Sequence, residues 1–255
     1  MFFKIELLPK RSISISKKEV EEVIWTFLCS LERNGQILKD YKLTKSENYT
    51  IYATCPKLDS FDDKYDGVYV KRDRRKILEL FEYVVTPLGE NIQSQPYCEC
   101  NSRTAIEMQT YDFDIDSVFT CCHCGKPIVL YELPFPAENQ EDYCWVQDWQ
   151  ENYSSMDMIW MNCLCDRYTG NQRVKLDSAL NKQGIEIAEY MSKQLDYPVY
   201  YHLECDYGKS VKSEMVGNKQ IHICPKCEKL MKRVSFSENH KRNVCENCAL
   251  SYDTH

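Results

Sequence analysis

Two C-x-x-C pairs lie close together near the end of the 255-residue chain, separated by residues 228–244. A turn can bring both sulfurs of such a pair to one side of a metal, and two pairs joined by a hairpin complete the tetrahedron that zinc prefers. This spacing fits the pattern of zinc ribbons, whereas a single pair would leave a redox role open. We therefore expect a zinc site made of four thiolates: Cys224, Cys227, Cys245 and Cys248. His222 and His240 are nearby alternative ligands, although four thiolates already complete the coordination.

A second cysteine cluster lies near the middle of the chain, where a C-x-C pair precedes a C-C-H-C run. Its spacing also suits a ribbon, with a tighter first turn, and Gly125 permits the left-handed turn that follows the last cysteine. The alternative is a compact loop domain with free thiols. The predicted ligands are Cys98, Cys100, Cys121 and Cys124, while Cys122 and His123 compete with them. The choice between Cys121 and Cys122 stays open at this point.

Both predicted sites are closed. A catalytic zinc keeps an open position for water or substrate, and four thiolates leave none. We expect two structural zinc ions per chain, each contributing roughly 10–16 kcal/mol to the folding of a small metal domain.

The total of 15 cysteines favours metal over disulfides, because it is odd and no secretory signal is evident at the N-terminus. The sequence also lacks a run of apolar residues long enough to span a membrane. These features predict a cytoplasmic protein without membrane attachment. Cys163 and Cys165 could join Cys144 or Cys205 in a third site, but no C-x-x-C pair supports it.

The first ninety residues predict the order β-α-β-β-α-β, which is the ferredoxin-like plan. A capping box from Ser16 to Glu19 starts the first helix, and Asn34-Gly35 ends it. The second helix is less certain from sequence, since residues 67–70 could also be extended. The expected strands cover 2–8, 37–43, 49–54 and 78–86, and the second helix covers 62–76.

The rest of the chain predicts a small α/β element between the two metal clusters. A strand is expected at 156–163, a helix capped by Asp177 or Ser178, and a strand at 199–203. The resulting α+β organisation has four parts: a ferredoxin-like domain (1–92), a zinc-ribbon insert (93–134), a small α/β element (135–210) and a C-terminal zinc ribbon (211–255).

Nucleic acid, DNA or RNA, is the first partner that the sequence suggests. Residues 71–76 hold five basic side chains, and the last ribbon adds more, with Phe236 available to stack a base. The net charge of −7 excludes a generally basic protein, and four thiolates cancel much of the charge of the ribbon. A solvated helix face is the alternative for 71–76. The predicted contacts are Arg72, Arg74, Arg75, Lys229, Lys232 and Arg233.

A protein partner is the second possibility. The aromatic segment 132–166 carries acidic residues and no Lys or Arg, so it could meet a basic protein such as a nuclease, in the manner of an inhibitor or immunity protein.

An enzymatic role is not expected. A pair of Cys163 and His202 could act as a nucleophile, but the sequence shows no triad, phosphate loop or paired-carboxylate motif and suggests no small-molecule substrate.

Several motifs together resemble an uncharacterised prokaryotic family of zinc-ribbon-containing proteins that are regarded as candidates for nucleic-acid binding. The motifs are N-G-Q-I-L at the end of the first helix, P-Y-C-E-C with C-C-H-C, Trp149-x-x-Asn152-Tyr153, Met161-Asn162-Cys163, D-S-A-L-N-K-Q-G from Asp177, Pro198-Val199-Tyr200-Tyr201, and C-P-K-C with C-E-N-C-A-L. The resemblance runs over most of the chain and implies the eight zinc ligands and a bacterial cytosolic setting. Cys122 departs from the family pattern.

Overall fold

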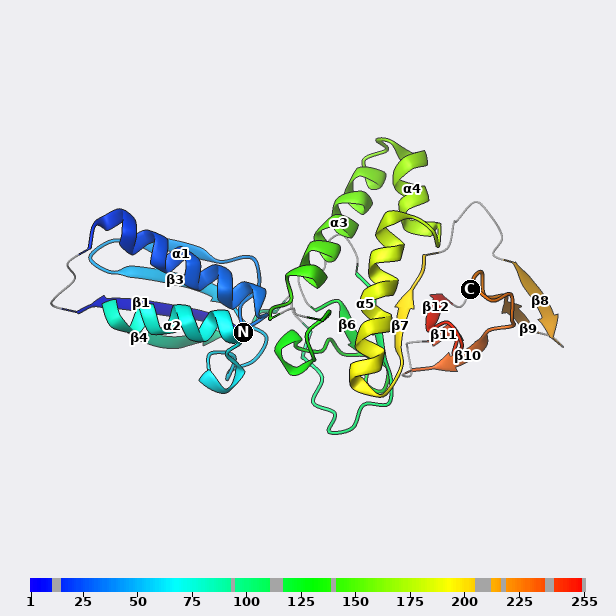
Figure 1. Cartoon of the computed structure of the whole chain (residues 1–255), viewed down its shortest axis with the longest axis horizontal. Coiled ribbons are helices and arrows are strands. Elements are labelled where there is room, and N and C mark those ends of the chain that lie inside the picture. The colour runs from blue at the N-terminus through cyan, green and yellow to red at the C-terminus, as the bar shows by residue number, and fades with distance from the viewer. Residues whose placement is uncertain are drawn as a thin grey trace. The chain divides into compact units, whose positions relative to one another are not determined.

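The computed structural model describes residues 1–10, 15–92, 95–110, 117–138, 141–204, 212–216, 219–236 and 241–253. It is a mixed α+β structure with several sheets. Two compact units divide the chain (Figure 1). Unit 1 comprises Met1–Tyr97, Val129–Phe135 and Asn139–Cys144, and unit 2 comprises Cys98–Ile128, Pro136–Glu138 and Trp145–His255.

Unit 1 is built on a four-stranded sheet. The order of its strands is β2-β3-β1-β4, and every neighbouring pair is antiparallel. Its elements in chain order are β1 (Phe2–Pro9), α1 (Lys17–Arg33), β2 (Lys42–Lys45), β3 (Tyr49–Thr54), the 3-10 turn η1 (Asp63–Tyr65), α2 (Val68–Leu80), β4 (Phe81–Gly89) and the 3-10 turn η2 (Leu130–Glu132).

One face of this sheet forms the core of unit 1. Phe3, Ile5 and Leu7 alternate along β1 and pair with the buried residues of β3. Because side chains alternate between the faces of a strand, these residues all point to the same side. Ile24 and Leu28 of α1 belong to the same buried cluster. The helices therefore cover the apolar face of the sheet.

The predicted start and end of the first helix are confirmed. Ser16 accepts a hydrogen bond from the amide of Glu19, whose carboxylate accepts one from the amide of Ser16, so the capping box is complete. Asn34 is the C-cap, and Gly35 follows it with a φ of +76°. The apolar residues Val20, Ile24, Phe27, Leu28 and Leu31 of this helix are buried, which fixes its orientation on the sheet.

Three boundaries in unit 1 differ from the prediction. The second helix spans Val68–Leu80 rather than 62–76, since Gly67 is its N-cap and the preceding residues form η1. The last strand therefore begins at Phe81 and not at residue 78. The second strand is Lys42–Lys45, shorter and later than 37–43, while Ile37 is buried before it.

Unit 2 is built on a six-stranded sheet of short strands in the order β10-β11-β12-β7-β5-β6. β7 pairs in parallel with both β12 and β5, whereas the other pairs are antiparallel. A separate hairpin is formed by β8 and β9. The elements are β5 (Ile106–Met108), β6 (Phe119–Cys121), α3 (Cys144–Met161), α4 (Asp166–Val174), α5 (Ala179–Leu195), β7 (Val199–His202), β8 (Ser213–Val216), β9 (Lys219–His222), β10 (Lys232–Ser235), β11 (Lys241–Cys245) and β12 (Leu250–Asp253).

Helix α5 packs tightly on β7. Ser178 caps it as predicted, accepting from the amide of Asn181 at 3.1 Å. Gly184 faces the aromatic rings of Tyr201 and Trp149, and a Cβ at this glycine would lie 2.2 Å from the nearest ring atom of Tyr201. The strand predicted at 199–203 is confirmed as β7, and this close contact fixes it against α5.

The strand predicted at 156–163 is wrong. These residues continue α3, which runs to Met161. The buried positions of α3 are Val146, Trp149, Tyr153 and Asp157, and their spacing of three to four residues is the period of a helix. The apolar residues that suggested a strand are instead exposed on the last turn of α3.

Among the described residues, the structure has no helix that is both long enough and apolar enough to cross a bilayer.

Candidate metal centres

The first four-cysteine site lies beside the β5–β6 hairpin of unit 2. Its four Sγ atoms, one from each of the predicted ligands, all lie within 4.8 Å of one another. Cys98 and Cys121 are buried, while Cys100 and Cys124 are half-buried. Cys121 is the last residue of β6, so pairing with β5 fixes its position. These four thiols converge as a metal site requires.

Backbone hydrogen bonds shape the second turn of this site. The amide of Cys121 donates to the carbonyl of Lys126 at 2.9 Å, and the amide of Gly125 donates to the carbonyl of Cys121 at 2.8 Å. Gly125 has a φ of +70°, which confirms the predicted left-handed turn.

Cys121, not Cys122, faces the cluster. Cys122 is 6% exposed and packs in an apolar group with Tyr200 and Val244. Burial raises the pKa of its thiol, so Cys122 is protonated at neutral pH. His123 is exposed and outside the four-cysteine group. Adjacent residues of a strand point to opposite faces, which explains why only one of the two cysteines reaches the site.

The second site joins β10, β11 and β12 with the turn that precedes them. The Sγ atoms of its four predicted ligands also lie within 4.8 Å of one another. The Sγ atoms of Cys227 and Cys245 are 3.5 Å apart. A Zn–S bond of about 2.3 Å in a tetrahedron gives sulfur atoms about 3.8 Å apart, so the spacing suits zinc.

Each of the two turns of the second site ends in a left-handed residue. The amide of Cys224 donates to the carbonyl of Lys229 at 2.8 Å, and the amide of Glu228 donates back to the carbonyl of Cys224 at 2.9 Å. Glu228 and Ala249 each follow a second cysteine and have φ values of +57° and +49°. Of the four cysteine turns that form the two metal centres, three thus end in a left-handed residue.

One thiol in each site ionises readily. Burial opposes ionisation of Cys98, but hydrogen bonds from the Arg103 side chain and the Cys100 amide outweigh it and lower its pKa to about 7. A hydrogen bond from the Lys229 amide lowers the pKa of Cys227 to about 7. Because the thiolate is the form that binds metal, each site holds a ligand prepared for it at neutral pH.

His222 does not join the second site. His222 is buried, and its ring lies 3.3 Å from the side-chain amide of Asn243. It is not part of the four-cysteine group. His240 lies outside the described residues.

The remaining predicted candidates form no third cluster within the part of the chain that the structure describes. Cys163 and Cys165 are exposed at the turn between α3 and α4, and Cys144 is half-buried at the start of α3. Cys205 lies outside the described residues.

The structure corrects one of the six predicted nucleic-acid contacts. Arg74 is 7% exposed and buried in unit 1, where its guanidinium donates to both carboxylate oxygens of Asp66 and to the hydroxyl of Tyr83. A side chain held in this way is a core ion pair and cannot reach a phosphate. Residues 71–76 are all charged, so their pattern did not indicate that Arg74 points inward.

Two other predicted contacts are exposed but already paired. Arg72 donates through two nitrogens to Asp73, each at 2.8 Å, and Lys232 lies 2.6 Å from Glu246. Arg75, Lys229 and Arg233 are exposed, and no ion pair holds them within the described residues. The structure thus leaves three of the six as available cations.

A buried polar network that the sequence did not predict lies on one face of the sheet of unit 2. The fully buried carboxylate of Glu107 accepts from Arg242 at 3.0 Å and from the hydroxyl of Ser251 at 2.5 Å. His202 lies 3.7 Å from both Glu107 and Asp253. This network joins β5, β7, β11 and β12, so it ties the strands of the two metal centres together. The sequence did not predict this network, because an acidic residue between Ile106 and Met108 in a strand suggests a solvent-exposed side chain.

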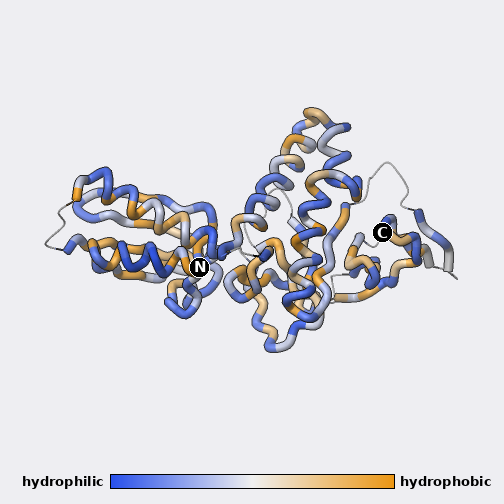
Figure 2. Tube along the Cα trace, in the orientation of Figure 1, coloured by the Kyte–Doolittle hydropathy of each residue, from blue (hydrophilic) through white to orange (hydrophobic). Residues whose placement is uncertain are grey.

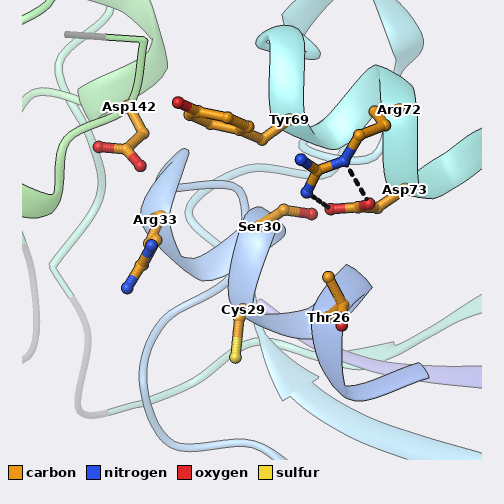
Figure 3. A pocket seen from close by; sticks show the side chains of 8 residues that line it. All are labelled: Thr26, Cys29, Ser30, Arg33, Tyr69, Arg72, Asp73 and Asp142. Carbon is orange, nitrogen blue, oxygen red and sulfur yellow. Dashed lines mark hydrogen bonds and ion pairs between the residues drawn. The ribbon is translucent and has the colours of Figure 1, made fainter. Parts of the chain in front are cut away.

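A cavity of about 310 Å³ lies in unit 1 between α1 and α2 (Figure 3). Arg72 and Asp73 pair within it, and the ring of Tyr69 stacks near the guanidinium of Arg72. Burial raises the pKa of Cys29, so its thiol is not an activated nucleophile at neutral pH. The cavity is lined by Thr26, Cys29, Ser30, Arg33, Tyr69, Arg72, Asp73 and Asp142.

These features define a protein with two four-cysteine sites, each able to hold a metal ion, within one unit. A family model described as a domain of unknown function (DUF2310) matches residues 101–204. An uncharacterised protein of Haemophilus influenzae is 26% identical over 238 residues, covering 85% of this chain and 84% of the relative. Both matches support a resemblance to an uncharacterised prokaryotic family, and neither name mentions zinc or nucleic acid.

The solved structure of Rv0793 from Mycobacterium tuberculosis overlaps 36% of this chain and 97% of its own, at 10% identity and a TM-score of 0.28. A TM-score this low does not establish a common fold.

Proposed function

We propose that zinc fills both four-cysteine sites and that the chain is a binding module without enzymatic activity. The observation that carries this proposal is the convergence of eight thiols into two closed groups that share one sheet. Four sulfur ligands suit zinc or an iron–sulfur cluster, and paired turns of this form are typical of zinc ribbons. In this proposal zinc acts as a rigid crosslink between the turns that hold its ligands. Four thiolates leave no coordination position for a substrate, so the role is structural and not catalytic.

The strand order of unit 1 supports a ferredoxin-like plan. Two helices and four antiparallel strands follow one another as β1-α1-β2-β3-α2-β4, with β1 and β3 in the middle of the sheet. This unit would serve as a second, independent surface for contact.

Nucleic acid is the partner class that we propose first, in line with the family resemblance. Support comes from Lys229 and Arg233, which are exposed beside the second metal centre, and from Arg75 on α2. Other basic residues of the ribbon are engaged, since Lys226 pairs with Glu189. With so few available cations, we expect a modest affinity that falls with salt.

An electrophoretic shift over a salt series tests this proposal with single- and double-stranded DNA and RNA. The double variant Lys229→Glu/Arg233→Glu should weaken binding and flatten its salt dependence. Lys18→Glu/Lys193→Glu makes the same change in net charge at exposed positions on α1 and α5 and should bind like the natural chain. An absence of binding at low salt, or equal losses in both variants, would refute the nucleic-acid role.

A basic protein is the second candidate partner. Asp148 and Glu151 are exposed one turn apart on α3. Charge complementarity would speed association with a basic surface. Much of the acidic segment is unavailable, however, because Asp142 and Asp157 are buried and Glu132 pairs with Lys57.

Affinity capture after nuclease treatment tests this second candidate. The variant Asp148→Lys/Glu151→Lys should lose a basic partner that the natural chain retains. Retention of the same partner by the variant would count against this surface.

A further inference from the structure

The turn between α3 and α4 is unusually exposed for a folded segment. Every residue of 161–168, which we call the helical tip, is exposed. The tip lies where the two helices meet, at the end of the hairpin they form (Figure 1). Neither metal centre nor the polar network of unit 2 uses it.

Two thiols lie on this tip. Cys163 and Cys165 are both exposed and both have left-handed backbone, with φ values of +55° and +53°. At Cys163 this conformation ends α3, since the amide of Leu164 donates to the carbonyl of Ile159 at 3.2 Å, and it costs a non-glycine residue about 1–2 kcal/mol. Cys165 is the N-cap of α4, yet its side chain accepts no capping hydrogen bond. Local structure therefore does not explain a cysteine at this position.

The spacing of these two thiols is already used for metal in the same molecule. Cys98 and Cys100 have the same C-x-C spacing, and their sulfur atoms converge in the first metal centre. A C-x-C turn can thus present two ligands to one ion. Zinc requires two more, and within the described residues no third cysteine, histidine or carboxylate completes a group at the tip.

A second copy of the chain would supply the missing pair. In a two-fold symmetric contact each copy contributes the same surface, so two ligands per chain become four. The tip is also self-complementary in charge. Asp166 and Arg167 are exposed neighbours without an ion pair in the part of the chain that the structure describes. In a symmetric contact, Arg167 of each copy can face Asp166 of the other.

The apolar side chains of the tip favour the same contact. Figure 2 shows a hydrophobic stretch at the end of the α3–α4 hairpin. Met161, Leu164 and Tyr168 are 50%, 62% and 58% exposed, and Met158 on the last turn of α3 is 51% exposed. Apolar residues clustered in this way on a soluble surface mark a contact site.

We propose that two copies of the chain join tip to tip through one zinc ion held by Cys163 and Cys165 of each copy. The four thiols lose their protons as the ion binds, which leaves a closed ZnS₄ centre at the dimer axis. This site is separate from the two structural centres and does not depend on the proposed partner.

Sedimentation of the full-length chain in excess zinc and reductant, with zinc counted per chain, tests the proposal. The natural chain should form a dimer with one zinc ion beyond those of the structural centres. Cys163→Ser/Cys165→Ser should be a monomer that loses only this ion. Cys29→Ser, which removes a thiol from α1, should remain a dimer. The shared ion is removed by substitution of its ligands and not by a chelator, because a chelator would also remove the ions of the two structural centres.

A second pair of variants leaves the thiols intact. Arg167→Asp should raise the dimer dissociation constant about tenfold or more through like-charge repulsion, and Asp166→Arg/Arg167→Asp should restore it. A zinc-saturated natural chain that stays monomeric would overturn the proposal. So would a dimer that survives the double serine change, or an extra ion held by a monomer, which would indicate a site within one chain.

Discussion

The sheet of unit 1 has strands of four to nine residues, whereas the six-stranded sheet of unit 2 has strands of only three to five. Unit 1 buries an apolar cluster shared by its helices and its long central strands. Unit 2 packs α5 on β7 in the middle of its sheet and carries a four-cysteine group on either side. Short strands offer few hydrogen bonds and little buried area, so we infer that metal holds the outer strands of unit 2 in place.

Removal of zinc should give the largest difference between the units. Structural zinc contributes roughly 10–16 kcal/mol to isolated ribbons, so a strong chelator should open the strands around both centres. Hydrogen exchange followed by mass spectrometry should show loss of protection in β5, β6, β10 and β11 and retained protection in β1, β3 and α1. Equal loss in both units would contradict the comparison.

Loss of one ligand should have the next largest effect. Cys121→Ser should release one zinc ion and destabilise the β5–β6 end of the sheet. Cys122→Ser is the matched control, since its thiol packs with Tyr200 away from the cluster, and it should retain both ions. The reverse outcome would assign the ligand to Cys122.

Zinc retention also predicts a pH dependence. Because thiolates bind the metal, zinc binding releases protons and its affinity should fall as pH falls. Cys98 and Cys227, with pKa values of about 7, start ionised above neutrality, whereas burial raises the pKa of Cys121 and Cys245, which release their protons to solvent as the ion binds. Competition with a colorimetric chelator at pH values from about 8 to about 5 would measure how zinc affinity changes with pH. An affinity that does not change with pH would exclude thiolate coordination.

A substitution that creates a new cavity in the core of unit 1 should leave metal binding unchanged. Leu28 is fully buried in α1, so Leu28→Ala should cost about 2–5 kcal/mol of unfolding free energy. Trp25→Ala removes a larger side chain from an exposed position of the same helix and should cost much less. Denaturant unfolding measures the loss of stability, and zinc analysis of the folded variant measures metal retention. Loss of zinc in Leu28→Ala would show that the stabilities of the two units are coupled.

A methyl group added at the contact between α5 and β7 should lower the stability of unit 2 by a smaller amount and leave unit 1 unchanged. Gly184→Ala places a methyl group against Tyr201 and should destabilise the unit by about 1–3 kcal/mol. Gly170→Ala in α4 meets no atom within 4 Å and should be neutral or stabilising. Thermal unfolding of the two variants gives the comparison, and equal melting temperatures would refute the tight packing.

The sequence predicted what depends on local chemistry. The eight cysteines, the capping box at Ser16 and the turn at Gly125 each follow from residue type and spacing over a few positions. The assignment of 156–163 failed because the apolar run resembles a strand, whereas the helical period from Val146 to Asp157 is visible only over a longer window.

Contacts between distant residues could not be predicted in this way. Glu107 and Arg242 are 135 residues apart, and only the pairing of β7 with β5 and β12 brings their strands into one sheet. The inward position of Arg74 likewise depends on Asp66 and Tyr83. A single sequence does not show which distant residues Glu107 and Arg74 contact.

Elemental analysis of the purified chain tests the central claim most directly. The Cys163→Ser/Cys165→Ser variant is the appropriate sample, because it removes the proposed site between copies and leaves the two four-cysteine groups. Two zinc ions per chain, falling to one in a further Cys245→Ser variant, is the result that the two closed centres predict. One ion or none in the starting sample, or iron in place of zinc, would contradict it.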